Sequence, residues 1–196
     1  MRLTLLIIGS FLPLVSGLTY IVSIWRGNTL PQRMTRFLML IITALMFGSL
    51  WADNDGSGVW LALVSFLQAL CIWALTFKHG IGGKSRLDIV CLLLCGIGLG
   101  IWAITDEPWL GLVASIVADF IACVPSLVKT VRLPHTELML FYALDAIAGV
   151  LIAAAGPFTA RTITFPAYIV AINLAFVAVI AWPRNRVAVI RSASAK

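Results

Sequence analysis

The sequence predicts an all-helical membrane protein with seven transmembrane helices, its N-terminus outside and its C-terminus inside the cell. Of its 196 residues, 61% are hydrophobic and 11% are charged, against roughly 25% charged residues in ordinary globular proteins. The mean hydropathy of +1.04 leaves too few polar residues to cover a water-soluble domain. Two further observations, seven apolar runs and an alternation of loop charge, predict the number and orientation of the helices.

The apolar runs have about the 20 residues that a helix needs to cross a bilayer core. The first run reaches Trp25, beyond the apolar region of a typical signal peptide, so we interpret it as a helix that is retained. The seven predicted helices are Leu3–Trp25, Met34–Trp51, Gly58–Phe77, Leu87–Thr105, Pro108–Val128, Leu138–Ala155 and Ile163–Trp182.

The segments between these runs alternate between basic and acidic. If the first, third and fifth connections and the C-terminal tail face the cytoplasm, that side holds all the Lys and Arg residues except Arg2 and Arg161. Such a bias sets the orientation of membrane proteins. The pattern assigns Arg26, Arg33 and Arg36 to the first cytoplasmic connection, and it indicates the inner membrane of a bacterium.

A faint internal repeat groups the helices. A shift of 106 residues superposes the segment Thr19–Arg33 on Pro125–Met139 and brings Gln68 within one residue of Asn173. Each segment has an apolar helix end, a basic residue and a Pro-containing turn. Two parallel units of three helices, joined by a linker helix, follow from this repeat. We predict a first bundle at 1–80, the linker helix at 81–107, and a second bundle at 108–196 with a basic tail.

The spacing Pro125-x-x-x-Lys129-x-x-Arg132 at a cytoplasmic helix end resembles the motif of the PQ-loop and SWEET-like membrane proteins. Transporters of the PnuC type share that architecture. The family pattern has glutamine after the proline, whereas this chain has Ser126. The resemblance implies a fold of three plus one plus three helices, with transport of a small solute between the two bundles.

Two carboxylates, Asp119 and Asp145, lie about halfway along their predicted helices. An ionised acid at that depth costs on the order of 2.5–3.5 kcal/mol, which makes both acids candidate functional groups. We expect no basic residue at their depth. Either the acids are protonated and carry a coupled proton, or they face a watery cavity and attract a cationic solute. The structural alternative is that each acid is neutral and hydrogen-bonds between helices.

Four other residues are candidates for the transport path. The amides of Gln68 and Asn173 can both donate and accept hydrogen bonds, which suits a polar solute, but they could equally join helices. The family resemblance implies that Asn173 lines the central cavity, with Gln68 as its counterpart. Pro13 and Pro125 interrupt backbone hydrogen bonding within their helices and are candidate hinges.

Several kinds of chemistry find no support. His79 and His135 lie far apart, so we predict no metal site and no cofactor, and no catalytic spacing indicates an enzyme. The basic residues form no patch on an amphipathic element, which excludes nucleic acid as a partner. The glycines Gly96, Gly98 and Gly100 predict close packing of the fourth helix.

Two functions therefore remain open. The first is a small-solute transporter that works by alternating access, with a coupled proton or a polar or cationic solute as its substrate. The second is a membrane scaffold or accessory subunit that binds a partner through its helix faces. The bilayer is the expected surrounding in both, and so small a chain is compatible with a homo-oligomer.

Overall fold

The computed structural model describes residues 2–52, 58–82, 85–104, 108–155 and 160–182, and every named element in this part of the chain is a helix. The prediction of an all-α fold is confirmed. The described elements are α1 (Arg2–Trp25), α2 (Arg33–Ala52), α3 (Gly58–His79), α4 (Arg86–Ala103), α5 (Pro108–Arg132), the 3-10 helix η1 (Pro134–Thr136), α6 (Met139–Ala155) and α7 (Ala160–Ala181).

The largest difference from the predicted bounds is at the end of α5. The sequence places this end at Val128, before two basic residues, but the helix continues to Arg132. Lys129 is buried, because its ammonium group pairs with Glu137 and with a backbone carbonyl. A charged residue whose partner lies inside the protein can be part of a buried helix, so the first basic residue does not mark the end of α5.

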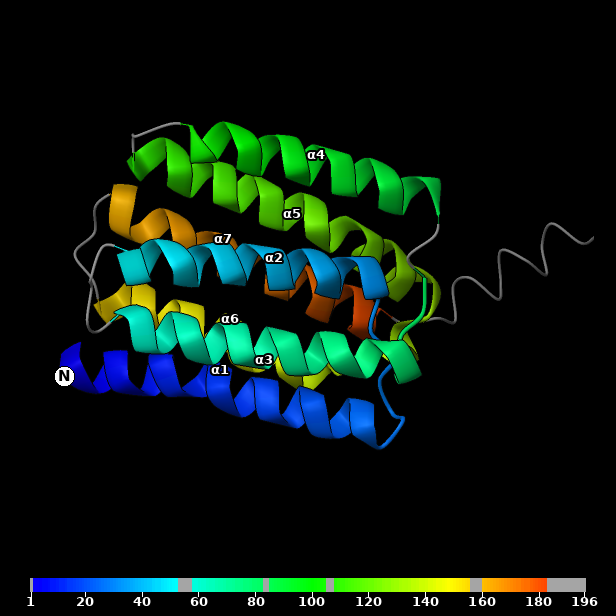
Figure 1. The fold of residues 1–196 in the computed structure, drawn as a ribbon. Coiled ribbons are helices and arrows are strands. Elements are labelled where there is room, and N and C mark those ends of the chain that lie inside the picture. Colours follow the sequence, from blue (N-terminus) through cyan, green and yellow to red (C-terminus); the bar gives the residue numbers. More distant parts are fainter. Residues whose placement is uncertain (1, 53–57, 83–84, 105–107, 156–159, 183–196) are drawn as a thin grey trace, which may run out of the picture.

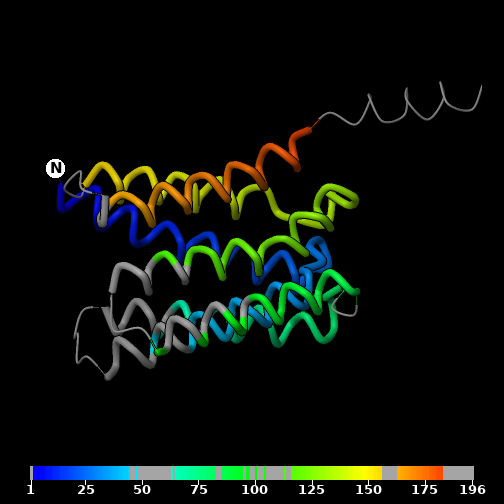
Figure 2. Tube along the Cα trace, turned by 90° about the horizontal axis from the view of Figure 1, so that it is seen from above, coloured from blue at the N-terminus to red at the C-terminus, as the bar shows by residue number. Residues whose placement is uncertain are grey.

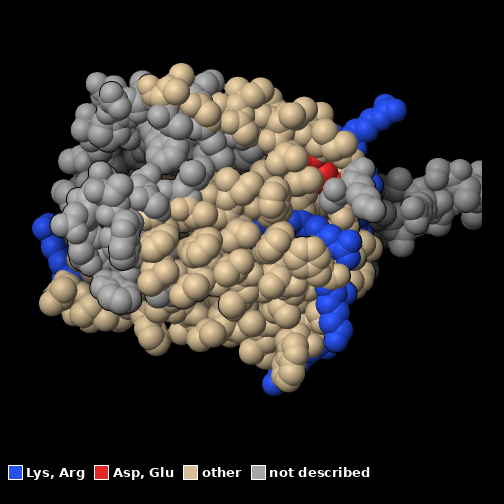
Figure 3. Space-filling model, in the orientation of Figure 1, with Lys and Arg blue, Asp and Glu red and all other residues tan. Residues whose placement is uncertain are grey.

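Successive helices run in opposite directions along one axis, so the starts of α2, α4 and α6 lie beside the ends of the odd-numbered helices (Figure 1). The N-terminus and the last described residues of α7 lie at opposite ends of the molecule (Figure 2). Lys and Arg side chains gather where α1 ends and α2 begins (Figure 3), and we call this the basic end. Arg2, the first residue of α1, lies at the other end.

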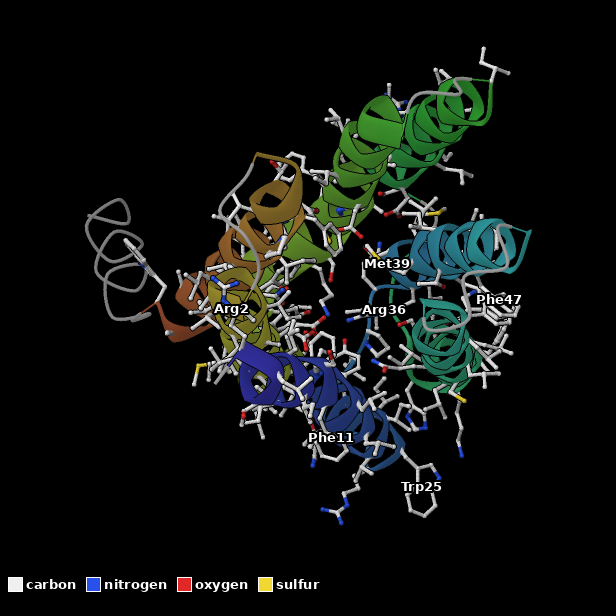
Figure 4. All side chains as sticks on the ribbon, turned by 90° about the vertical axis from the view of Figure 1, so that its left-hand side faces the viewer. Arg2, Phe11, Trp25, Arg36, Met39 and Phe47 are labelled. Atoms are coloured by element: carbon white, nitrogen blue, oxygen red, sulfur yellow. The ribbon has the colours of Figure 1, made fainter. Side chains whose placement is uncertain are left out.

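Six helices form a closed ring, seen along their axes in Figure 4. The neighbours around it are α1, α3, α2, α5, α7 and α6, and α6 in turn packs against α1. The helix α4 lies outside this ring, against α5 and α2. Helices that follow one another in the chain are therefore not always neighbours, since α1 packs against α3 and α6 rather than against α2.

Two groups of buried apolar side chains hold the ring together. The larger group joins α1, α3, α6 and α7, with Tyr20, Phe141 and Phe176 at its centre. The smaller joins α2 to α5 through Leu38, Ala118 and Ala122, where alanines let the two backbones approach closely.

The outward faces of the helices are strongly apolar. Phe11 and Trp25 point away from the ring (Figure 4), and their exposed fractions are 61% and 73%. Within the described residues, α1 and the stretch Ile163–Ala181 of α7 are long and apolar enough to cross a membrane. The helix α6 is also apolar but has only 17 residues.

Candidate functional site

Arg36 occupies the middle of the ring. It lies three residues after the start of α2, and its side chain points inward between the helices (Figure 4). Its guanidinium carbon lies 4.5 Å from the centre of the Tyr20 ring on α1 and 5.7 Å from that of Phe141 on α6. Such stacking over aromatic rings stabilises a guanidinium group away from bulk water.

The environment of Arg36 is unusual for a charged side chain. Its Nε has no hydrogen-bond partner, although that atom is fully buried. The side chain as a whole is half-buried. Among the described side chains the ion pair is Lys129–Glu137, and no carboxylate oxygen lies within 4.0 Å of the Arg36 guanidinium.

Asp119 and Asp145 approach Arg36 from two other helices. Asp119 on α5 accepts a hydrogen bond of 2.6 Å from the hydroxyl of Tyr168 on α7. Asp145 on α6 lies 2.5 Å from the hydroxyl of Ser16 on α1. Both acids are half-buried. The positive charge of Arg36 interacts electrostatically with each of them. The sequence predicts no basic residue at the depth of these acids and did not anticipate Arg36, whose charge acts on both of them.

Ser16 connects Asp145 to one of the predicted hinges. Its hydroxyl also lies 3.0 Å from the carbonyl oxygen of Pro13, one turn earlier in α1. A hydroxyl has one proton to donate, so Ser16 can donate a hydrogen bond either to Asp145 or to the Pro13 carbonyl, but not to both at once. If Asp145 is protonated it can donate to Ser16, which leaves the Ser16 proton for Pro13.

The two predicted amides lie at helix contacts. Gln68 on α3 packs against Gly17 of α1 so closely that a Cβ on Gly17 would come within 2.1 Å of the Gln68 amide. Asn173 on α7 is buried, and its Nδ2 donates 2.8 Å to the carbonyl of Ile169 in the same helix. The structure thus brings the two acids toward Arg36, whereas these amides are engaged in packing and in a local hydrogen bond.

Prolines interrupt three of the described ring helices. Pro13 and Pro125 lie inside α1 and α5, as predicted. Pro166 inside α7 is a further one that the sequence analysis did not consider. It lies two residues before Tyr168, the partner of Asp119.

A second polar group, which we call the Glu137 cluster, closes the basic end beneath Arg36. It consists of Glu137, Lys129, Tyr20 and Tyr142. Glu137 Oε1 pairs with the Lys129 ammonium, and Oε2 accepts hydrogen bonds of 2.8 Å and 2.9 Å from Tyr20 and Tyr142. Lys129 also donates 2.6 Å to the carbonyl of Leu30 in the connection between α1 and α2.

The Glu137 cluster was missed because Lys129 and Glu137 stand in the sequence like ordinary loop charges. The available signal was Glu137 itself, the only acid among the basic residues of its connection. Because the Arg36 guanidinium lies over the Tyr20 ring, Arg36 adjoins the Glu137 cluster.

Backbone hydrogen bonds tie three connections together at the basic end. The Leu30 amide donates 2.8 Å to the carbonyl of Thr136, which links the connections after α1 and α5. The Ile81 amide donates 2.9 Å to the carbonyl of Pro31, which adds the connection after α3. The side chain of Gln32 then donates 2.7 Å to Asp88 at the start of α4.

Comparison of the chain with models of protein families, with characterised proteins and with solved structures gives no match. Among the described residues, no group of three His, Cys, Asp or Glu side chains could hold a metal ion. The site must therefore be interpreted from its own chemistry, which consists of one guanidinium, two acids and three hydroxyls from Ser16, Tyr20 and Tyr168.

Proposed function

We propose that this chain is an integral membrane transporter that moves a small polar solute by alternating access, with a proton carried by Asp119 or Asp145. The observation that carries the proposal is that the charge of Arg36, which points into the ring, acts on both Asp119 and Asp145, although the three residues come from different helices. Intramembrane charges that face a bundle interior commonly mark substrate or proton pathways.

The membrane setting follows from the surface of the helices. Side chains such as Leu3, Ile97 and Leu174 have exposed fractions of 70%, 60% and 51%. A water-soluble protein rarely exposes so much contiguous apolar surface. Together with the charges at the basic end, this supports seven transmembrane helices in the inner membrane of a bacterium, with the basic end in the cytoplasm.

The pairing of helices supports the arrangement of three plus one plus three. Exchanging α1, α2 and α3 with α5, α6 and α7 turns each neighbouring pair of the ring into another neighbouring pair. The pair α1–α3 becomes α5–α7, α2–α3 becomes α6–α7, and α1–α6 becomes α5–α2. This exchange, with α4 outside, is what two parallel repeats around an axis along the membrane normal require, and it agrees with a PQ-loop or SWEET-like architecture.

The described contacts also suggest how access could alternate. The basic end is held closed by the Glu137 cluster and by the hydrogen bonds among its connections. To release a solute on that side, the pairing of Lys129 with Glu137 and Leu30 must break. Protonation of Asp145 would return the Ser16 hydroxyl to Pro13 and so change the hydrogen bonding at the α1 hinge.

The test is uptake by liposomes that contain the purified chain. An inward pH gradient should drive accumulation of a transported solute, and Asp119→Asn and Asp145→Asn should each reduce the driven uptake about 10-fold or more. Asp106→Asn, in the segment between α4 and α5, is the matched control and should keep the wild-type rate. Unchanged driven flux in both acid variants would contradict the assignment of proton coupling to these residues.

The alternative is a membrane scaffold or accessory subunit, and the placement of α4 favours it. This helix lies outside the ring, and Leu93, Leu94 and Ile97 on it are exposed. Another copy of the chain or a partner helix could pack there. A stable complex that depends on α4, together with no flux of sugars, amino acids or nucleosides, would favour this alternative over transport.

A further inference from the structure

We propose that Arg36 binds the carboxylate group of the solute, so that the substrate is a small organic acid rather than a neutral or cationic molecule. The inference rests on the proposed transport function and specifies its substrate class. It depends on the position of Arg36 and on what its neighbours already bind.

An arginine inside a helical bundle normally has a carboxylate partner, because an uncompensated buried charge is strongly unfavourable. Arg36 has no carboxylate within 4.0 Å among the described residues, and its Nε has no hydrogen-bond partner. The guanidinium presents two parallel N–H donors that match the two oxygens of a carboxylate. Its guanidinium carbon lies over the Tyr20 ring, 4.5 Å from the ring centre.

The nearest acids are engaged elsewhere. Glu137 already binds Lys129 and the hydroxyls of Tyr20 and Tyr142. Asp119 and Asp145 accept hydrogen bonds from Tyr168 and Ser16 on neighbouring helices. Each of these acids is therefore held by a described contact other than Arg36, and none of them forms an ion pair with its guanidinium.

The flanking acids limit which anion can bind. A phosphate group carries about −1.5 to −2 charges at neutral pH, whereas a carboxylate carries one, so Asp119 and Asp145 repel phosphate more strongly. A proton on one of these acids lowers the repulsion of an entering carboxylate. Binding of the solute and of the proton would then favour each other, as symport requires.

The binding experiment uses the purified full-length chain in detergent, with calorimetry as the readout. The probes are lactate and benzoate, with methyl benzoate as the uncharged analogue and inorganic phosphate as the competing anion. We expect saturable binding of at least one carboxylate, tighter at pH 5.5 than at pH 7.5. Methyl benzoate and phosphate should bind at least about 10-fold more weakly.

Arg36→Gln should weaken carboxylate binding about 10- to 100-fold, which corresponds to the loss of hydrogen bonds to a charged group. Arg132→Gln is the matched control, since Arg132 is exposed at the same end of the molecule. Arg36→Lys keeps the positive charge but lacks the planar pair of donors, so it should weaken binding by a smaller factor. It serves as the second variant if Arg36→Gln fails to fold.

Two results would overturn the inference. One is wild-type affinity for carboxylates in both Arg36 variants, and the other is tighter binding of phosphate or of methyl benzoate than of any carboxylate. Flux of a neutral solute through the same preparation, without carboxylate binding, would reject this substrate class but leave the transport function intact. Absence of all flux together with Arg36-dependent carboxylate binding would instead reject transport.

Discussion

Glu137 binds three side chains at once in the described part of the chain. One oxygen faces the Lys129 ammonium, and the other accepts from two tyrosine hydroxyls that come from α1 and α6. The exposed fractions of Glu137 and Lys129 are 7% and 8%. Removing one member of such a group leaves the other members buried without their partners. The resulting loss of folding free energy is larger than the stabilisation that the intact interaction provides.

Glu137→Ala should therefore lower the free energy of unfolding by about 3 kcal/mol or more. The measurement is a denaturant or thermal unfolding curve of the purified protein in detergent. Glu107→Ala, in the segment between α4 and α5, is the control and should change stability little.

A double-mutant cycle separates the ion pair from its surroundings. Lys129→Met removes the charge that Glu137 neutralises. The free energy of unfolding of the double variant Lys129→Met/Glu137→Ala should therefore fall by about 1 kcal/mol less than the sum of the decreases in the two single variants. Additive losses would mean that the two side chains do not stabilise each other.

Three arginines near the start of α2 illustrate what the sequence can and cannot predict about the site. Arg26 is exposed, Arg33 donates 3.0 Å from its Nε to the carbonyl of Thr76, and Arg36 points into the ring. The charge pattern groups all three as cytoplasmic. Only the rotation of α2 about its axis distinguishes them, and a helix that is apolar on most sides does not reveal that rotation.

At the scale of helices, Gly149 allows α6 and α7 to lie close together. A Cβ at this position would lie 2.8 Å from Cγ2 of Val170 and 3.2 Å from the carbonyl oxygen of Pro166. The backbone oxygen cannot move aside without displacing α7. Small residues serve this purpose throughout membrane helix packing.

Gly149→Leu should therefore push the two helices apart and destabilise the protein by about 1–3 kcal/mol, as overpacking generally does. The control is Gly96→Leu on α4, where an added Cβ meets no atom of the described side chains or backbone within 4 Å. The unfolding curve of the control should match that of the wild type. Equal losses in both variants would contradict the close contact at Gly149.

The same comparison corrects one expectation about α4. The sequence predicts that its glycines allow close packing, but an added Cβ at Gly96 or Gly100 meets no atom of the described residues within 4 Å. Neither glycine is therefore needed for a close approach to any described neighbour of α4. Most helix bounds, in contrast, follow from the length and composition of the apolar runs.

At the scale of the whole molecule, orientation can be tested directly. In a variant without its native cysteines, Asn28→Cys lies at the basic end and Asn54→Cys lies in the segment between α2 and α3. A membrane-impermeant thiol reagent added to intact cells should label Asn54→Cys but not Asn28→Cys, and inverted vesicles should reverse this. Labelling of both from one side would reject the proposed topology.

The sequence contains more information about membrane topology than about which helices pack against one another. The charge alternation and the repeat predict an orientation and two groups of three helices, and both stay predictions until they are measured. The electrostatic influence of Arg36 on Asp119 and Asp145 depends on the contact of α5 with α2 and of α6 with α1. Contacts between helices so far apart in the chain leave no trace in local composition or periodicity.

The packing of α1 against α6 sets the order in which the molecule can be completed. Ser16 and its partner Asp145 are 129 residues apart in the chain. At a synthesis rate of about 5–20 residues per second, roughly 6 to 26 s separate the appearance of the two residues at the ribosome. If the helices span a membrane as proposed, α1 spends that interval with α3 as its available ring neighbour, and the side that later faces α6 contacts lipid. In that case, the first helix to enter the membrane is among the last to reach its final neighbours.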